Sequence, residues 1–158
     1  MTNAKKLSSK RITWIKEQGY FRYTDEQIQA WAFGNRFAYR LCTALLLVGV
    51  LLQNIPLLVL MNAVAFASIF LPNHPFDYIY NYGVRKWTKG PKLPKRSIQL
   101  KFACTMASLF IASTIFFFLK GMITAGYIMG LHIVVVASLV SLFDFCIPSK
   151  IFNYFTGR

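Results

Sequence analysis

One histidine lies in the middle of a long uncharged segment of the chain, where titratable side chains are rare. His132 is near the centre of residues 121–143, which contain no Asp, Glu, Lys or Arg. A polar group at that depth of an apolar helix either hydrogen-bonds a neighbouring helix or takes part in function. We expect a neutral histidine hydrogen-bonded to a neighbouring helix, for example to Asn62 or Ser108. Substrate or proton handling and cofactor binding are the alternatives.

Asp144 follows directly after the same segment and is the only acid close to the interior of an expected membrane span. An unpaired carboxylate in such a place costs free energy, so it must pair with a base or take up a proton. Arg36, Arg40 and Lys150 are the bases expected on the same side of the membrane. The sequence therefore predicts a structural ion pair at Asp144.

The three cysteines, Cys42, Cys104 and Cys146, are dispersed, and no pair has the spacing of a metal knuckle or a dithiol motif. Ser149 stands where a redox dithiol built on Cys146 would need its second thiol. We expect free buried thiols. The chain also has no phosphate loop, nucleophile elbow or zinc signature. The sequence thus predicts no catalytic residue, no metal site and no cofactor, and it leaves four candidate intramembrane functional residues: His132, Asn62, Asp144 and Cys146.

The elements that must position these residues are long apolar helices. Residues 102–119 and 121–143 are uncharged, and at 1.5 Å per residue they reach roughly 27 and 34 Å, close to the thickness of a hydrocarbon core. Only Lys120 separates them, so they predict an antiparallel pair of spans. The length of the chain allows one compact unit and no more.

A third uncharged segment, residues 41–72, is too long for one span. At its middle Gln53, Asn54 and Pro56 predict a turn, because proline removes a backbone donor and disfavours helix just before it. We therefore expect spans at about 37–53 and 56–72. The predicted fold class is all-α, a four-helix transmembrane bundle over residues 31–158.

The distribution of charge tests this division. The chain is 56% hydrophobic and 15% charged, with 18 Lys and Arg residues and a net charge of +13. Four spans with both termini in the cytoplasm place 17 of the 18 bases inside and only Lys120 outside, whereas three spans divide them nine and nine. The positive-inside rule favours four spans with N and C termini cytoplasmic. The expected location is the bacterial inner membrane, with an organelle inner membrane as the alternative.

Residues 1–30 are expected to form a basic, amphipathic cytoplasmic arm. Ser9 is expected to cap a short helix that ends at Gly19 and lies in the membrane interface. The stretch from Thr24 to Gln27 has the pattern of a capping box, so the helix that leads into the first span should begin there.

The cytoplasmic loop 73–101 is basic and rich in aromatic residues. It is expected to form an interfacial helix or an aromatic belt, with docking of a partner protein as the alternative. The long apolar segments argue against a nucleic-acid partner. The basic residues instead predict contact with anionic lipids at the cytoplasmic face. The candidate contacts with headgroups or partners are Trp14, Trp31, Arg36, Arg40, Tyr78, Tyr82, Arg85, Lys86 and Trp87.

Several short motifs carry a resemblance to a known family over about residues 35–155. They are Phe76-Asp77-Tyr78, Lys92-Leu93-Pro94-Lys95, Lys101-Phe102-Ala103 and Phe143-Asp144-Phe145-Cys146. With them the chain resembles a family of small bacterial membrane proteins of unknown function, DUF4395. The resemblance implies a four-span bundle with a central basic loop and a setting in thiol or sulfur metabolism. Family members often end the last span with two cysteines separated by two residues. Ser149 replaces the second one here, which argues against dithiol exchange and leaves a single reactive Cys146 as an option.

Three functions are compatible with these features. The leading hypothesis is a non-enzymatic accessory or scaffolding subunit of a larger inner-membrane complex, bound to other subunits or to a second copy of the chain. The first alternative is a small transporter or channel component for a sulfur compound or another anion, with His132 and Asn62 lining a polar cavity. The second is a membrane thiol redox protein that acts through Cys146.

Overall fold

The computed structural model describes residues 7–157, and this range is almost entirely helical and contains no strand. The all-α prediction is therefore confirmed. Three bases counted above, Lys5, Lys6 and Arg158, lie outside the described residues.

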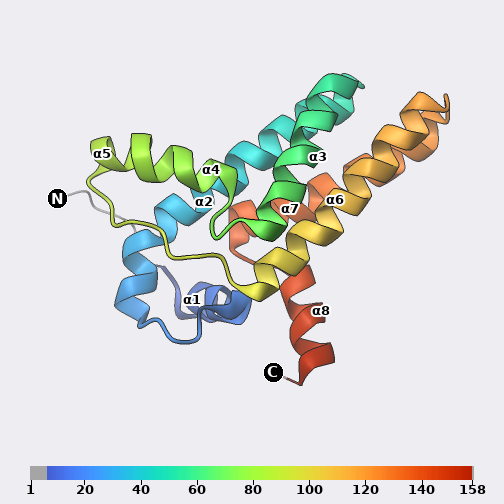
Figure 1. Cartoon of the computed structure of the whole chain (residues 1–158). Helices are drawn as coiled ribbons and strands as arrows, with labels where there is room; N and C mark the ends of the chain where they lie inside the picture. The colour runs from blue at the N-terminus through green and yellow to red at the C-terminus, as the bar shows by residue number, and fades with distance from the viewer. Residues whose placement is uncertain (1–6, 158) are drawn as a thin grey trace.

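Two helical hairpins form the body of the molecule (Figure 1). The first joins α2 (Asp25–Leu51) to α3 (Ile55–Phe70), and the second joins α6 (Ile98–Leu119) to α7 (Ile123–Phe143). Helix α3 packs against α6 and α2 packs against α7, so the four helices close into one bundle. Leu46, Val50, Leu58 and Ile111 are fully buried between them.

Both hairpin turns lie at the same end of the bundle (Figure 1). In the first turn, Gln53 adopts a left-handed φ of 48° and the Asn54 side chain accepts a hydrogen bond from the Leu57 backbone N–H at 3.0 Å. The turn predicted at these residues is confirmed. Gln53 Nε2 also donates to the Tyr127 hydroxyl at 2.9 Å, which joins the two hairpins at this end.

Among the described residues, two helices are long and apolar enough to cross a membrane, α6 and α7. The number rises to three if α3 and the segment Pro75–Thr88, bent by 85° relative to it, are counted as one span. Helix α3 alone has 16 residues, fewer than the ~20 that a straight span usually needs. Helix α2 is longer but carries Arg36 and Arg40. The two long apolar helices indicate a membrane protein.

The short elements gather at the opposite end, called the base below (Figure 1). They comprise α1 (Ser9–Ile15), the π-helical turn η1 (Lys16–Tyr20), α4 (Pro75–Ile79), the π-helical turn η2 (Tyr80–Val84), α5 (Arg85–Thr88) and α8 (Ile147–Thr156). Helix α8 packs against α6 and η1, and it was not predicted. Its beginning has a local signal, because Pro148 stands in its first turn.

The described part of the N-terminal arm is built into the core of the base. Ile15 is fully buried, and Tyr20 packs with Trp31 at 5.0 Å between ring centroids. The capping box at Thr24 is confirmed, with both reciprocal hydrogen bonds present. The cap predicted at Ser9 is wrong, because α1 begins after Ser8, whose side chain makes no capping hydrogen bond. Apolar residues that the sequence placed at the membrane interface instead pack on the bundle.

Candidate functional site

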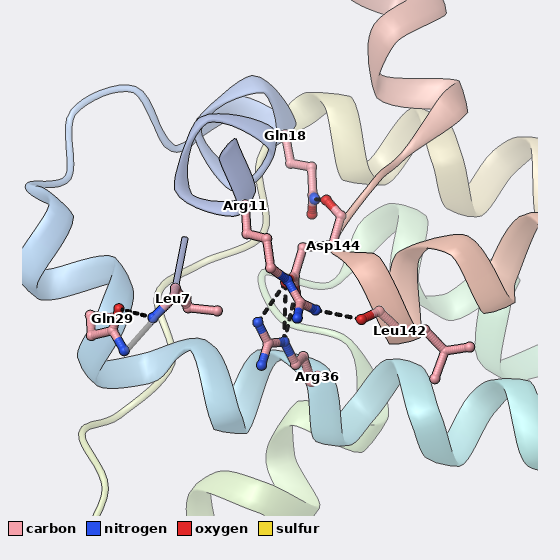
Figure 2. A network of polar contacts seen from close by, with 7 residues as sticks. All are labelled: Leu7, Arg11, Gln18, Gln29, Arg36, Leu142 and Asp144. Atoms are coloured by element: carbon pink, nitrogen blue, oxygen red, sulfur yellow. Dashed lines mark hydrogen bonds and ion pairs between the residues drawn. The ribbon is translucent and has the colours of Figure 1, made fainter. Parts of the chain in front are cut away.

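The Asp144 carboxylate is the centre of the densest polar network in the base (Figure 2). Asp144 is 1% exposed. It follows the last residue of α7 and adopts the left-handed conformation, with a φ of 63°. Arg36 binds it with two guanidinium nitrogens, Nη2 at 2.6 Å from Oδ2 and Nε at 2.9 Å from Oδ1. Arg11 Nε donates to Oδ2 at 2.8 Å. The predicted ion pair is confirmed for Arg36, whereas Arg11 was not foreseen.

The other two predicted partners of Asp144 lie elsewhere. Arg40 is exposed, beside Phe33, Phe37 and Leu41. Lys150 Nζ is 3.1 Å from the Glu17 carboxylate.

The arm also binds the backbone at the end of α7. Gln18 Nε2 donates to the Asp144 carbonyl at 2.7 Å, and Arg11 Nη2 donates to the Leu142 carbonyl (Figure 2). The last carbonyls of a helix have no partner within the helix, and a positive charge near them is favourable. Arg11 therefore stabilises both the Asp144 carboxylate and the end of α7. These contacts join the N-terminal arm to residues about 130 positions later in the chain.

A second buried ion pair holds the central loop. Asp77 is fully buried, and Arg96 binds it with Nε at 2.6 Å from Oδ2 and Nη2 at 2.6 Å from Oδ1. Arg96 Nη1 donates to the Tyr39 hydroxyl, and the guanidinium lies over the Tyr39 ring at 4.7 Å. This pair was missed, although Asp77 is the only acid between Glu26 and Asp144.

His74 lies beside this pair and is neutral. Its Nδ1 accepts a hydrogen bond from the Phe76 backbone N–H at 3.2 Å, so Nδ1 carries no proton. Burial, with the nearby positive charge of Arg96, lowers the pKa of His74 to about 4. The proton of the neutral ring is therefore on Nε2.

A cavity of about 270 Å³ lies between α2, α6, α7 and α8. Cys42, Cys104 and Cys146 all line it, together with both histidines, His74 and His132. The remaining wall is mostly aliphatic, so the cavity is an apolar space with a few polar groups at defined places. No group of three or more His, Cys, Asp or Glu side chains within residues 7–157 is arranged to hold a metal ion.

All three thiols are free, as predicted, although only Cys146 is buried and the other two are half-buried. Cys146 precedes α8, and its sulfur accepts a hydrogen bond from Ser149 Oγ at 3.1 Å. Burial raises the pKa of the Cys146 thiol, and the bond from Ser149 only partly opposes this effect. Because the thiolate is the nucleophile, a raised pKa makes this cysteine less reactive.

His132 and Asn62, the two other intramembrane candidates, do not meet. His132 is exposed on the outer side of α7 and stacks on Phe110 of α6 at 5.1 Å between ring centroids. Asn62 Oδ1 accepts a hydrogen bond from Ser108 Oγ at 2.8 Å, which joins α3 to α6. The two partners suggested for His132, Asn62 and Ser108, bond each other, and His132 instead contacts α6 through its ring.

Most of the predicted contact residues lie on the surface of the base. Trp87 of α5 is 92% exposed, with Arg85 and Lys86 beside it. Tyr82 is also exposed and stacks on Tyr78 at 6.3 Å. On α8, two further aromatic side chains, which were not predicted, are exposed: Tyr154 and Phe155.

Three predicted contact residues are withdrawn from this surface. One is Arg36, because its guanidinium binds Asp144 and its side chain is only 16% exposed. Trp31 is 4% exposed and packs with Tyr20 and Tyr23, so it cannot reach headgroups. Trp14 is half-buried, with its ring edge against Phe145 at 5.2 Å and Lys10 over its face. The sequence pattern assigns these tryptophans to the membrane surface from their spacing in the chain. It does not indicate the aromatic partners that bury them.

Comparison with known proteins places the chain in a family. The model of DUF4395, a domain of unknown function, matches residues 33–156. No curated protein and no solved structure gives a match. The matched range contains both buried carboxylates together with Arg36 and Arg96, whereas Arg11 and Gln18 lie before it. Because the match covers most of the sequence, the chain belongs to the DUF4395 family.

Proposed function

We propose that all four long helices cross the membrane, with the base and both termini in the cytoplasm of a bacterial cell. Two observations support this topology. The hairpin turns share one end of the bundle, where Lys120 is the single base of residues 7–157, and the other bases of that range lie toward the opposite end. The positive-inside rule then orients the base toward the cytoplasm. Arg36 lies on the half of α2 nearest the base and Arg40 lies just beyond its middle, so the long side chain of Arg40 must extend toward the base to reach the headgroups.

Within this topology we propose that the protein is a non-enzymatic accessory or scaffolding subunit of a larger inner-membrane complex. The supporting observation is the set of exposed aromatic side chains on the base, outside the four proposed spans, where lipid tails do not cover them. Trp87, Tyr82, Tyr154 and Phe155 are 68% to 92% exposed. Trp and Tyr are the residues that most often anchor protein interfaces.

The two buried ion pairs make this surface rigid. Arg36 and Asp144 join α2 to the α7–α8 junction, and Arg96 and Asp77 join the start of α6 to α4. The elements that carry the exposed aromatics are thus fixed to the bundle before any partner arrives. A preorganised surface loses less conformational entropy on binding, which favours affinity.

The test is gentle extraction of the tagged protein from native membranes and quantification of the proteins that accompany it. Tyr82→Ala combined with Trp87→Ala removes the aromatic anchors of α5 and η2. The matched control is Phe66→Ala, which removes an exposed aromatic ring from α3 within a proposed span. We expect the amount of a stoichiometric partner that co-purifies with the double variant to fall by about tenfold or more, as for a pair of interface hot spots. The control should retain the partner. Retention of every partner by the double variant would contradict the proposal.

The two alternative functions have less support. An anion transporter needs a positive or strongly polar path, but the Arg96 guanidinium at the cavity is already neutralised by Asp77. A redox role for Cys146 needs a reactive thiolate, but burial raises the pKa of that thiol and position 149 holds a serine. Loss of activity in Cys146→Ser, measured once a partner or substrate is known, would favour the redox role.

A further inference from the structure

The thiol-lined cavity is separate from the aromatic surface of the base and supports a second activity. We propose that it binds an uncharged amphiphile, with a hydrogen-bond-accepting head beside Tyr39 and His74 and an apolar tail directed along α6 toward the middle of the bundle. This inference is independent of the accessory role, but it rests on the proposed membrane topology, because the ligand is taken from the bilayer.

The shape of the cavity sets the form of the ligand. Along α6 its lining runs from Leu100 to Ile111, a rise of roughly 16 Å along the helix axis. Its volume of about 270 Å³ is just below the range of about 300–1,000 Å³ typical of ligand sites. A long and narrow space of this size suits one alkyl chain. Five alanines in the wall leave room for it: Ala38, Ala65, Ala103, Ala107 and Ala137.

The polar end of the cavity selects an uncharged head. Arg96 contributes a guanidinium there, but its charge is balanced by the two short contacts with Asp77. His74 is neutral, because its Nδ1 accepts a backbone hydrogen bond, and its Nε2–H is available as a donor. The Tyr39 hydroxyl accepts a bond from Arg96 and keeps its own proton to donate. An acceptor oxygen, such as that of an ester or a quinone, matches these donors, whereas a charged head would meet no net charge of opposite sign.

The position of the cavity gives the ligand a path from the bilayer. Most of the lining residues are in α2, α6 and α7, and two of them are exposed, His132 and Ile151. The cavity thus reaches the outer surface of the bundle on the side of α7 and α8. An amphiphile dissolved in the membrane can enter there without crossing water.

The cysteines provide a direct readout. The chain has three cysteines in all, and each of them lines the cavity, so alkylation of the native protein by N-ethylmaleimide measures access to it. The protein in phosphatidylcholine nanodiscs is labelled with and without three probes that share a twelve-carbon chain: monolaurin, laurate and dodecyltrimethylammonium. Decylubiquinone, an uncharged quinone, is added as a fourth probe. A bound probe slows the labelling rate by the factor 1 + [L]/Kd, where [L] is the free probe concentration. A probe concentration of about nine times Kd therefore slows labelling about tenfold.

We expect monolaurin or decylubiquinone to slow labelling and the two charged probes to leave it unchanged. Whichever uncharged probe acts at the lower concentration identifies the source of the ligand, a lipid ester or a quinone. Equal protection by laurate would overturn the assignment of an uncharged head. If none of the four probes slows labelling at a pH at which the chain is alkylated in their absence, the ligand site itself is overturned.

Variants separate the tail from the head. Ala103→Leu or Ala107→Leu fills the cavity and should abolish protection, while Ala112→Leu, an exposed position on the same helix, should leave it intact. Helix content by circular dichroism must match the native chain for each of these variants. Tyr39→Phe nearly keeps the volume and removes the hydrogen bond to the ligand together with the one from Arg96, so the affinity for the uncharged probes should fall by about 3- to 10-fold. Protection that survives both alanine variants would also overturn the site.

Discussion

The ion pair at Asp144 makes a quantitative prediction about stability. Asp144→Asn keeps the shape of the side chain and removes its charge, so two guanidinium groups lose their counterion. The Arg36 side chain is 16% exposed and that of Arg11 is 29% exposed. Breaking a buried pair by removing one partner costs about 3–5 kcal/mol, and we take the lower end because water reaches Arg11. The expected loss is about 3 kcal/mol in the free energy of unfolding.

The assay is thermal unfolding of the purified protein in detergent, followed by near-UV circular dichroism. In a chain of this length 1 kcal/mol corresponds to about 2–4 °C, so the Tm of Asp144→Asn should fall by about 6–12 °C. The matched control is Asp25→Asn. Its partner Lys16 lies 2.5 Å away, but the two side chains are 34% and 63% exposed, and surface pairs contribute about 0–1 kcal/mol.

Two results would refute the reasoning. The first is a Tm of Asp144→Asn within error of that of Asp25→Asn, which would mean that the network carries no more energy than a surface pair. The second concerns the double variant Arg36→Met with Asp144→Asn. Replacement of the Arg36 guanidinium by an apolar side chain should recover part of the lost stability, because it removes one of the two charges that Asp144→Asn leaves without a counterion, while asparagine tolerates the left-handed φ of 63° at position 144. A double variant less stable than Asp144→Asn would show that the charges themselves are not the cause.

Two further predictions concern the arm and the central loop. Gly19 has φ 95°, and a Cβ there would lie 2.3 Å from Gln99 Oε1 and 2.5 Å from Ser97 Cβ, so Gly19→Ala should destabilise the fold by about 2–3 kcal/mol. Gly121→Ala has a similar φ of 72° but open space, so it should lose only about 1 kcal/mol in the same Tm measurement. Burial lowers the pKa of His74 from 6.5 to about 4, so the neutral ring contributes fully to the free energy of unfolding above pH 6.5. That contribution, about 3 kcal/mol, is lost as the pH falls from 6.5 toward 4. His74→Gln should flatten the pH dependence of the unfolding free energy in that window, and an unchanged slope would rule out His74 as its source.

Local features of this fold could be read from the sequence. The uncharged segment 102–119 lies within α6, which begins four residues earlier at Ile98, and the segment 121–143 forms α7 apart from its first two residues. Asn54 with Pro56 set the first hairpin turn, and the reciprocal bonds of Thr24 and Gln27 begin α2. Each of these signals acts within one or two turns of helix, so the residues that carry it are neighbours in the chain.

The partners of the buried groups could not be read in the same way. Arg11 reaches Asp144 from 133 residues away, and several bases are equivalent candidates for this carboxylate on sequence grounds. Nothing in the local sequence sets Arg11 apart, because a basic segment beside a membrane is usually solvated or in contact with headgroups. Tyr20 and Trp31 pack together in the base for a related reason, since their burial depends on how η1 folds back onto α2 and α6. Such choices are made by tertiary packing and leave no periodic pattern.

The second ion pair links the architecture of the base to the chemistry of the cavity. Arg96 is part of the cavity wall, and a lone guanidinium there would attract anions into the bundle. Asp77 removes that attraction with two contacts of 2.6 Å, and the same contacts fix α4 to the start of α6. One carboxylate therefore holds the loop that presents the exposed aromatics and keeps the cavity neutral. Asp77 and Arg96 both lie within the part of this chain that matches the family, whereas Arg11 reinforces the frame of the base from outside that part.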